Sequence, residues 1–439
     1  MVRKRPTRDH VEEPAPVPEP AASLEEMWSI FDPTLAVDPA SNLYIPRHDP
    51  QLLKLCFELK RTPHHRHAFL CGHRGSGKTT ELKRLRALPE ITEKYLTVYL
   101  TAQDFGSEAV HLTHDALLVE IGLALVSVGE QYGLDSTLAD ELDKWGQQVV
   151  RTFLHNEEAR AEAGAGAHAW IAFFKAQLST RREWKTEQKQ ILEPKVQDLV
   201  DILNRMAQDL KNRSQKRLLV IVDDLEKGES DAHREMHGRL FQEHYEVLVQ
   251  PRFSIVYTLP IYFRALPGSR VPSDHIYAFS AARIYERVQK SRDRPPLSRE
   301  GHGYQLMYRF VETRVRELAA LFAPKTLDEL VIIGGGLFRE TAGAIRDAAY
   351  FALIRNAVCI EQTDVRQVFD QIKKEYQPIV RGEAVRVLKA VLDSEQGWVP
   401  DVEPYLQSRA VVEYEDDDLW LDLRYVLKSY VRGLALAEG

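Results

Sequence analysis

Four short apolar runs alternate along the chain with longer segments of helical periodicity. The runs are rich in leucine, valine, isoleucine and aromatic residues, and they lie at residues 67–71, 95–100, 217–222 and 253–258. Runs of this length and composition are typical of strands that are covered on both faces, as in a parallel sheet. Residues 113–213 and the chain from residue 304 onward show mainly helical periodicity. The pattern therefore predicts an α/β protein with a parallel sheet and two large helical regions.

The last part of the chain has a different order of elements. Its apolar spacing predicts two helices, a two-stranded hairpin and a final helix, at residues 384–392, 402–408, 410–422 and 424–434. This order resembles a winged-helix module, and such modules commonly bind DNA. The turn of the hairpin is Glu415-Asp416-Asp417-Asp418, however, and four carboxylates there would repel phosphate. We therefore expect the module to contact protein or to lock the chain internally, with DNA as the less favoured partner.

The N-terminal 40 residues are rich in proline and acidic residues, and we expect them to form a flexible arm. The basic start of the chain is followed by a polar stretch, so no secretory signal is expected. No stretch reaches the ~20 apolar residues of a membrane-spanning helix. The net charge is −7, and the three cysteines lie far apart in sequence. These features predict a cytoplasmic protein with reduced thiols, no membrane contact and no broad nucleic-acid-binding surface.

The most specific motif lies at residues 69–80, which read FLCGHRGSGKTT. Its spacing matches the G-x-x-x-x-G-K-[ST] pattern of a Walker A phosphate loop, and an apolar strand enters it while a helix leaves it, as that motif requires. Glycines let successive backbone N–H groups converge on phosphate oxygens, while Lys78 would supply a cation to the phosphates and Thr79 a hydroxyl to Mg²⁺. The expected nucleotide-binding residues of the motif are Gly72, His73, Arg74, Gly75, Ser76, Gly77, Lys78, Thr79 and Thr80.

A second apolar run ends in carboxylates. Residues 217–222 are followed by Asp223, Asp224 and, two positions later, Glu226. Acids at the ends of parallel strands lie at the ligand-binding edge of the sheet. Asp223 is the Walker B candidate that would hold Mg²⁺ together with Thr79. Asp224 is the candidate for polarising the attacking water, and Glu226 is an alternative base. A strand that is simply capped by solvated acids is the other interpretation of this run.

Residues 41–375 resemble ATPases of the AAA+ superfamily and STAND switch ATPases, close to archaeal origin-recognition proteins. The resemblance rests on the phosphate loop, on the Walker B run with its paired aspartates, and on a glycine-rich turn before a helix that begins near Arg339. In that family, an arginine at this place in a helical lid reaches back to the γ-phosphate. The resemblance therefore implies this role for Arg339, and the alternative is a surface arginine at the start of a helix.

The same resemblance implies further contacts with the nucleotide. In AAA+ ATPases the segment before the phosphate loop often helps to hold the adenine, which points to Tyr44 and Ile45, although ordinary core packing would also explain them. Thr258 lies at the polar end of its strand, where it could sense the γ-phosphate or cap the turn at Pro260. A second arginine from a neighbouring subunit is a further implication, and Arg264 and Arg270 are the candidates for it.

These observations combine into one expected architecture and function. The expected parts are a flexible arm at 1–40, a P-loop core at 41–275 with a helical insertion at about 130–213, a helical lid at 276–375 and a winged-helix-like domain at 376–439. The expected function is a slow, Mg²⁺-dependent ATPase switch that regulates a protein effector and forms a homo-oligomer. A role in bacterial defence is implied by the resemblance alone. Two alternatives stay open: an ATP-dependent DNA-binding adaptor and a non-hydrolysing, nucleotide-bound scaffold.

Overall fold

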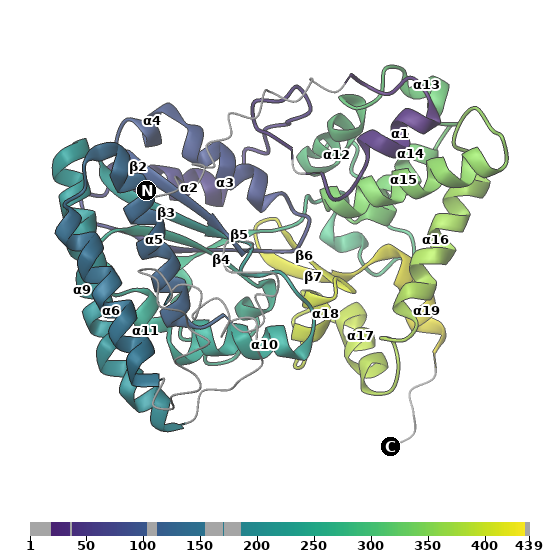
Figure 1. Ribbon diagram of the computed structural model, residues 1–439. Coiled ribbons are helices and arrows are strands. Elements are labelled where there is room, and N and C mark those ends of the chain that lie inside the picture. The colour runs from purple at the N-terminus through teal and green to yellow at the C-terminus, as the bar shows by residue number, and fades with distance from the viewer. Residues whose placement is uncertain (1–18, 36, 103–111, 154–169, 171–185, 435–439) are drawn as a thin grey trace.

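The computed structural model describes residues 19–35, 37–102, 112–153, 170 and 186–434. A five-stranded sheet forms its centre, and the strands are β1 (His67–Gly72), β2 (Tyr95–Thr101), β3 (Arg217–Asp223), β4 (Ser254–Leu259) and β5 (Ile276–Phe279). All neighbouring strands run parallel, in the order β2-β3-β4-β1-β5 (Figure 1). The predicted α/β fold with a parallel sheet is confirmed. The four-residue β5 was not predicted, because its apolar run is too short to stand out.

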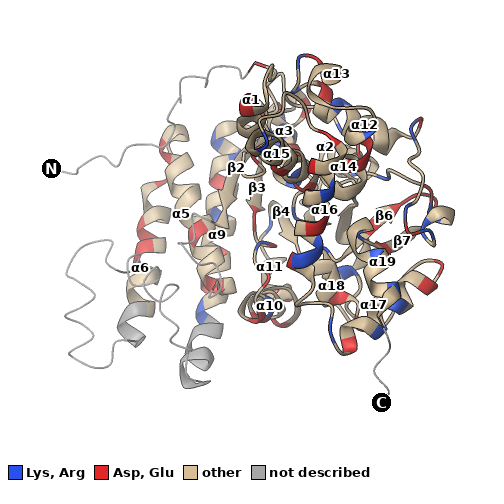
Figure 2. Cartoon of the chain, turned by 90° about the vertical axis from the view of Figure 1, so that its right-hand side faces the viewer, with Lys and Arg blue, Asp and Glu red and all other residues tan. Residues whose placement is uncertain are grey.

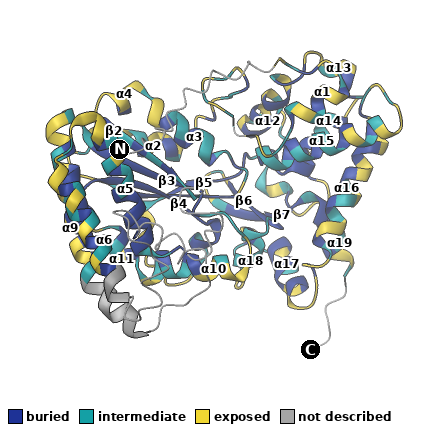
Figure 3. Cartoon of the chain, viewed as in Figure 1, coloured by how far each residue is buried: buried dark blue, intermediate teal, exposed yellow. Residues whose placement is uncertain are grey.

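Helices cover both faces of the sheet. Alternate residues of a strand point to opposite faces, and here the residues on both faces are apolar and must be buried. On one face lie α2 (Pro50–Arg61), α3 (Lys78–Ala87) and α4 (Pro89–Thr92), which pack their leucines and isoleucine on the strands. The other face is covered by α5 (His114–Tyr132) and α9 (Thr186–Ser214). Strands β1 and β4 are buried along their whole length, and the central sheet is mostly dark blue in Figure 3. This double coverage explains why the strands read as continuous apolar runs.

Further elements complete the core. Between β2 and β3, α6 (Ser136–Phe153) packs beside α9, and residues 154–169 and 171–185 of the predicted insertion lie outside the described residues. Short helical elements connect the later strands. Between β3 and β4 lie α10 (Asp231–Gly238), the π-helix η3 (Arg239–Glu243) and α11 (Tyr245–Leu248), and between β4 and β5 lie the 3₁₀ turns η4 (Ile261–Arg264) and η5 (Ser273–His275). The 3₁₀ turn η6 (Arg287–Gln289) follows β5 and precedes the helical region that comes next.

A second group of helices forms a lid beside the sheet (Figure 1). It comprises α12 (His302–Glu312), α13 (Leu318–Leu321), α14 (Thr326–Gly334), α15 (Phe338–Ile354) and α16 (Gln362–Tyr376). The chain between α14 and α15 passes through Gly335 and Gly336, whose φ angles are 63° and 75°. Glycine takes these left-handed angles without strain, so the chain can turn sharply into α15.

Part of the flexible arm predicted for residues 1–40 is a packed helix instead. Residues 1–18 lie outside the described residues, but α1 (Leu24–Ile30) packs on α15 of the lid. Ser23 caps this helix, and Leu24, Met27 and Phe31 are buried. Their spacing of three and four places them on one helical face. This spacing indicates a helix, but the proline-rich composition of the segment led to the prediction of an unfolded arm.

The C-terminal part contains the predicted elements, namely two helices, a hairpin and a final helix. It contains α17 (Glu383–Asp393), α18 (Glu403–Gln407), β6 (Val411–Glu415), β7 (Leu419–Leu423) and α19 (Tyr425–Gly433). Strands β6 and β7 pair antiparallel around the acidic turn. Acidic and basic residues are interspersed along the helices of the lid and of this C-terminal module (Figure 2). Among the described residues, no helix is long and apolar enough to cross a bilayer.

Candidate nucleotide-binding site

The predicted phosphate loop connects the end of β1 to the start of α3. Gly75 and Gly77 have φ angles of 85° and 100°, which residues with a Cβ adopt only with strain. Gly77 is the N-cap of α3. It has no side chain that could accept a hydrogen bond from the first-turn N–H groups of α3. A helix N-terminus with such groups favours a bound anion. The local backbone is therefore suited to phosphate.

Lys78 is folded back into the loop and is only 3% exposed. Its ammonium lies 2.9 Å from Oε1 of Glu226 and donates hydrogen bonds to the carbonyl oxygens of Gly72 and His73, at 2.8 and 3.0 Å. Burial opposes ionisation of Glu226, but the charge and hydrogen bond of Lys78 and a hydrogen bond from Thr258 outweigh it and hold the pKa of Glu226 below its ordinary value. A phosphate would compete with this carboxylate for Lys78.

The predicted Walker B residues lie at the same edge of the sheet. Asp223 is fully buried, and its carboxylate accepts hydrogen bonds from the Tyr99 hydroxyl at 2.6 Å and from the Asp224 N–H at 2.7 Å. The Thr79 hydroxyl also bonds to it. Burial, with the charges of Glu226 and Asp224, raises the pKa of Asp223 above its ordinary value. Thr79 and Asp223 are thus brought together, as a shared Mg²⁺ would require.

Asp224 takes an unusual backbone conformation. Its φ is 70°, and its Oδ2 lies 2.7 Å from Nζ of Lys227, while its buried Oδ1 has no partner in the described part of the chain. Thr258 on β4 accepts a hydrogen bond from the Leu225 N–H at 2.9 Å. Thr258 therefore holds the segment after β3. This contact differs from the cap of the turn at Pro260, one of its two predicted roles, and the other role, contact with the γ-phosphate, stays a prediction.

The two predicted adenine contacts lie beside α3. The Tyr44 hydroxyl donates to Oε1 of Glu81, one turn beyond Lys78, at 2.8 Å. Ile45 is half-buried and packs between two apolar clusters of the core and the lid. Thr80 lies in the first turn of α3 and is half-buried. A contact between these residues and a nucleotide remains a prediction.

The lid lies directly on the phosphate loop. The Arg339 N–H donates to the carbonyl of Gly75 at 3.3 Å, and a Cβ placed on Gly75 would come within 2.5 Å of the Arg339 Cβ. A Cβ placed on Gly77 would lie 3.5 Å from the Phe338 ring, which is an ordinary van der Waals contact. Burial and the nearby charges of Arg74 and Arg409 lower the pKa of Arg339. The structure thus brings Arg339 to the phosphate loop from a separate helical group, while its contact with a γ-phosphate stays a prediction.

The C-terminal module also contacts the phosphate loop. An internal contact of this module was expected, but the residues that make it were not predicted. The Glu413 N–H on β6 donates to Nε2 of His73 at 2.8 Å. The Glu413 carboxylate accepts from Arg264 at 2.6 Å and from the Ser280 hydroxyl at 3.0 Å, and the Ala281 N–H donates to the Glu413 carbonyl at 3.0 Å. Burial, with the charge of Lys78, lowers the pKa of His73 to about 3, so the ring is neutral and can accept.

Arg264, a candidate for reaching into a neighbouring subunit, is therefore bound inside its own chain. Its side chain is mostly covered and pairs with the fully buried Glu413. An acidic residue at an inward position of the apolar stretch 410–414 is the sequence signal for this contact. It could not reveal which core residue would neutralise it.

A second set of ion pairs joins the lid, the core and the C-terminal module. Arg409, at the start of the module's hairpin, lies 2.6 Å from Glu229 of the core and 3.1 Å from Glu340 of the lid. Arg424 pairs with the same Glu340 at 2.9 Å, and Arg74 of the phosphate loop lies 3.9 Å from Glu229. Three parts of the chain that are distant in sequence therefore meet beside the phosphate loop.

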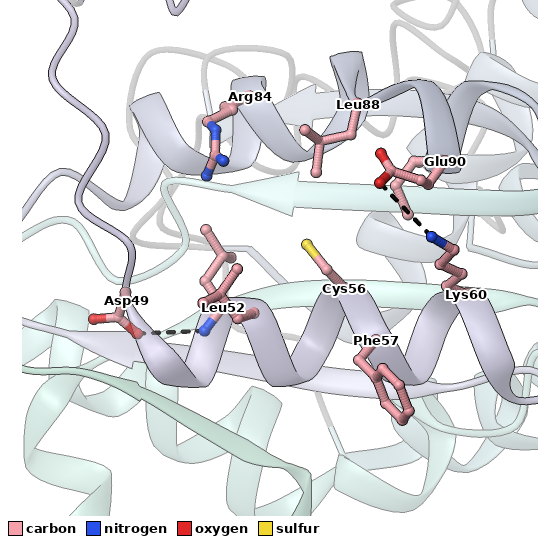
Figure 4. A pocket seen from close by; sticks show the side chains of 10 residues that line it. Asp49, Leu52, Cys56, Phe57, Lys60, Arg84, Leu88 and Glu90 are labelled. Carbon is pink, nitrogen blue, oxygen red and sulfur yellow. Dashed lines mark hydrogen bonds and ion pairs between the residues drawn. The ribbon is translucent and has the colours of Figure 1, made fainter.

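A separate hollow lies between α2 and the α3–α4 segment (Figure 4). It is lined by apolar side chains, including Leu52, Phe57 and Leu88, with Lys60 and Glu90 at its rim. It includes no residue of the phosphate loop. The hollow is therefore distinct from the predicted nucleotide site.

Comparisons with known proteins place these features in context. No family model and no curated protein matches the chain. Solved structures that are similar to it include Cdc6p from Pyrobaculum aerophilum, at 15% identity and a TM-score of 0.38, over 92% of this chain and 96% of that one. Another is the ORC1 protein of Aeropyrum pernix in complex with DNA, at 12% identity and a TM-score of 0.38, over 93% of this chain and 96% of that one.

A third similar structure is Drosophila ORC bound to DNA, at 10% identity and a TM-score of 0.41, over 99% of this chain and 96% of that one. At such identities the likeness concerns the fold alone. The chain itself has the strand order, the phosphate loop after β1, the carboxylates after β3, the helical lid and the C-terminal hairpin module that the sequence led us to expect. The fold therefore has the predicted parts, a P-loop core with a parallel sheet, a helical lid and a C-terminal hairpin module, while the resemblance to AAA+ and origin-recognition ATPases stays an interpretation of the sequence motifs.

Proposed function

We propose that this protein binds ATP with Mg²⁺ at the phosphate loop, hydrolyses it slowly and acts as a conformational switch. One observation carries the proposal: the lid and the C-terminal module both make direct hydrogen bonds to the loop, through Arg339 to Gly75 and through Glu413 to His73. A ligand that occupies the loop therefore acts on both contacts. This is the arrangement that a nucleotide-controlled change in domain position requires.

The residues at the loop fit a nucleotide and a metal ion. Buried oxygen atoms of Ser76 in the loop, and of Asp224 and Glu226 just after β3, have no hydrogen-bond partner in the described part of the chain, so they are available to a ligand or to water. In the proposed complex, Thr79 and Asp223 hold Mg²⁺, which would neutralise charge on the transferred phosphate. Lys78 binds the phosphates, and the free carboxylate oxygens are available to orient water.

Access to the loop links binding to movement. Ser76 and Asp223 are fully buried and Lys78 is nearly so, while Phe338 and Arg339 of the lid lie against the loop at Gly77 and Gly75 and Glu413 of β6 bonds to His73. Nucleotide binding would thus require the lid or the C-terminal module to shift. We propose that the γ-phosphate then fixes a new position of the lid through Arg339, and that hydrolysis or exchange releases it.

Calorimetry of the full chain with ATP, ADP and GTP, with and without Mg²⁺, tests the binding, and phosphate release tests the hydrolysis. We expect Mg²⁺-dependent binding of ATP and measurable turnover. Absence of binding to any of the three nucleotides would refute the proposal. Binding without turnover would instead support the non-hydrolysing scaffold.

Replacement of Arg339 by alanine is expected to uncouple the lid from the γ-phosphate. The variant should keep ADP affinity but lose about tenfold in ATP affinity, since a charge-assisted hydrogen bond to phosphate contributes on the order of 1.5 kcal/mol. Small-angle scattering should then give the same dimensions with ATP and with ADP. A variant that changes shape with ATP as the wild type does would place the switch elsewhere. Arg346→Ala, on the same helix but paired with Asp32 and stacked on Trp28, is the matched control.

We further propose that the switch regulates a protein partner and works as a homo-oligomer, and the STAND resemblance extends this to regulation in bacterial defence. Helix α18 precedes the hairpin and so takes the place of the recognition helix in a winged-helix module. It has only five residues, and none of them is basic. It packs on η4 of the core, and Gln407 donates to the Gly228 carbonyl at 3.0 Å. This position is unsuited to entering a DNA groove.

DNA binding is expected to be weak, independent of sequence and lost at moderate salt. The acidic turn at residues 415–418 repels DNA phosphates, and α18 is covered by the core. Only scattered basic side chains are then left to contact phosphate. Fluorescence anisotropy with duplex DNA, at two salt concentrations and with either nucleotide, measures this. Tight, ATP-dependent binding at physiological salt would make the DNA-binding adaptor the better proposal.

A further inference from the structure

Arg47 is a buried cation that holds the backbone of the phosphate loop. It lies between α1 and α2 and is 7% exposed. Its Nη1 donates to the carbonyl oxygen of Ser76 at 2.8 Å, and its Nη2 donates to the carbonyl of Ser280 at the end of β5. The guanidinium also lies 4.0 Å from the centre of the Phe279 ring, and its Nε is 3.5 Å from Asp49. No pattern in the sequence predicted these contacts.

The Ser76 carbonyl belongs to the peptide unit that carries the Gly77 N–H. A peptide unit is planar and trans, so its C=O and N–H point in opposite directions. By holding this carbonyl on one side, Arg47 fixes the Gly77 N–H on the other. Phosphate loops bind anions through such oriented N–H groups. The direction of this peptide unit thus decides whether the loop offers a donor or a repelling carbonyl oxygen.

Gly77 itself cannot fix that direction. Its φ is 100°, and a glycine can adopt several other backbone conformations of similar energy. The peptide unit before Gly77 can therefore rotate at little cost. Neither the helix cap nor a side chain of the loop holds the Ser76 carbonyl, whereas the guanidinium does so with a charge-assisted hydrogen bond. Its permanent charge keeps this anchor in place at any ordinary pH.

We propose that Arg47 is a positioning residue for nucleotide binding, which orients the Ser76–Gly77 peptide unit toward the phosphates. The inference rests on the proposed nucleotide binding and adds a residue outside the motif to it. It predicts an effect on every ligand that carries a diphosphate. A purely structural role, in which Arg47 only ties the segment before α2 to the sheet, would lower stability and leave the affinity of the folded protein unchanged.

Two variants of the full chain test the proposal, with ADP and inorganic pyrophosphate as ligands in calorimetry. Arg47→Met keeps an apolar stem without donors, and we expect it to lower both affinities by the same factor, about 10- to 100-fold. Arg47→Lys restores one donor and the charge, and we expect a loss of about three- to tenfold. Arg66→Met is the control, because Arg66 also bonds a backbone carbonyl and pairs with Glu58 beside the same sheet, away from the loop. It should lower the melting temperature without changing affinity.

The outcomes separate this proposal from the proposed function. If the wild type binds neither ADP nor ATP, the nucleotide-binding function itself fails. If the wild type binds ADP and folded Arg47→Met binds ADP and pyrophosphate equally well, the positioning role is wrong. Should Arg47→Met not fold, Arg47→Lys decides, and wild-type affinity for both ligands in that variant would overturn the proposal.

Discussion

Replacement of Lys78 by alanine should lower ATP and ADP affinity about 100-fold or more, because the phosphates lose the buried cation at the loop. The ammonium of Lys78 is already held by Glu226 and by the carbonyls of Gly72 and His73, so its position is fixed before a ligand arrives. A fixed charge does not have to be ordered on binding, which increases its contribution to affinity. Isothermal titration calorimetry with both nucleotides measures the loss.

The substitution has a second consequence that needs its own control. Without Lys78, the carboxylate of Glu226 is left buried and unpaired, and breaking a buried ion pair on one side typically destabilises a fold by about 3–5 kcal/mol. The double variant Lys78→Ala/Glu226→Gln removes both charges and should recover most of that stability. It should still fail to bind nucleotide. Unchanged affinity in either folded variant would contradict the assignment of the phosphate loop.

The parts of the fold that the sequence predicted are those with local signals. The runs at 67–71 and 217–222 became β1 and β3, since central strands of a parallel sheet must be apolar on both faces. The phosphate loop was predicted because its glycine and lysine spacing is fixed by the ligand and not by the surrounding fold. The helix that carries Arg339 was predicted from a glycine turn, which the φ angles of Gly335 and Gly336 explain.

The parts that could not be predicted are contacts between distant segments. Glu413 meets His73 across 340 positions of sequence, and Arg47 meets Ser280 across 233. Nothing in the periodicity of either segment identifies its partner, because a buried polar group only requires that some partner exists. The packing of α1 on the lid is an intermediate case. Its apolar face and cap are visible in the sequence, but they were outweighed by the prolines that precede them.

The carboxylate that orients the attacking water is expected to be Glu226. It contacts Lys78 at 2.9 Å and so lies closest to the expected position of the phosphates, and its Oε2 has no partner in the described part of the chain. Asp224, the first candidate from the sequence, instead pairs with Lys227 at 2.7 Å. One of its oxygens is nevertheless free, so both residues must be tested.

Glu226→Gln should lower the turnover number about 100-fold or more, since an amide cannot accept a proton from water and general-base catalysis typically contributes 10²–10⁴-fold. The same variant should bind ATP as tightly as the wild type or more tightly, because the phosphates no longer compete with a carboxylate for Lys78. Asp224→Asn should lower turnover less. Glu243→Gln, an exposed residue of η3, is the control and should leave both quantities unchanged.

Single-turnover phosphate release with bound ATP separates these effects on chemistry from effects on binding. A large loss of turnover together with unchanged or increased affinity is the expected signature of Glu226→Gln, and a structural defect would instead reduce both. If Asp224→Asn stops turnover while Glu226→Gln preserves it, the base is Asp224. In that case the pair formed by Glu226 and Lys78 is a resting-state contact that nucleotide binding breaks.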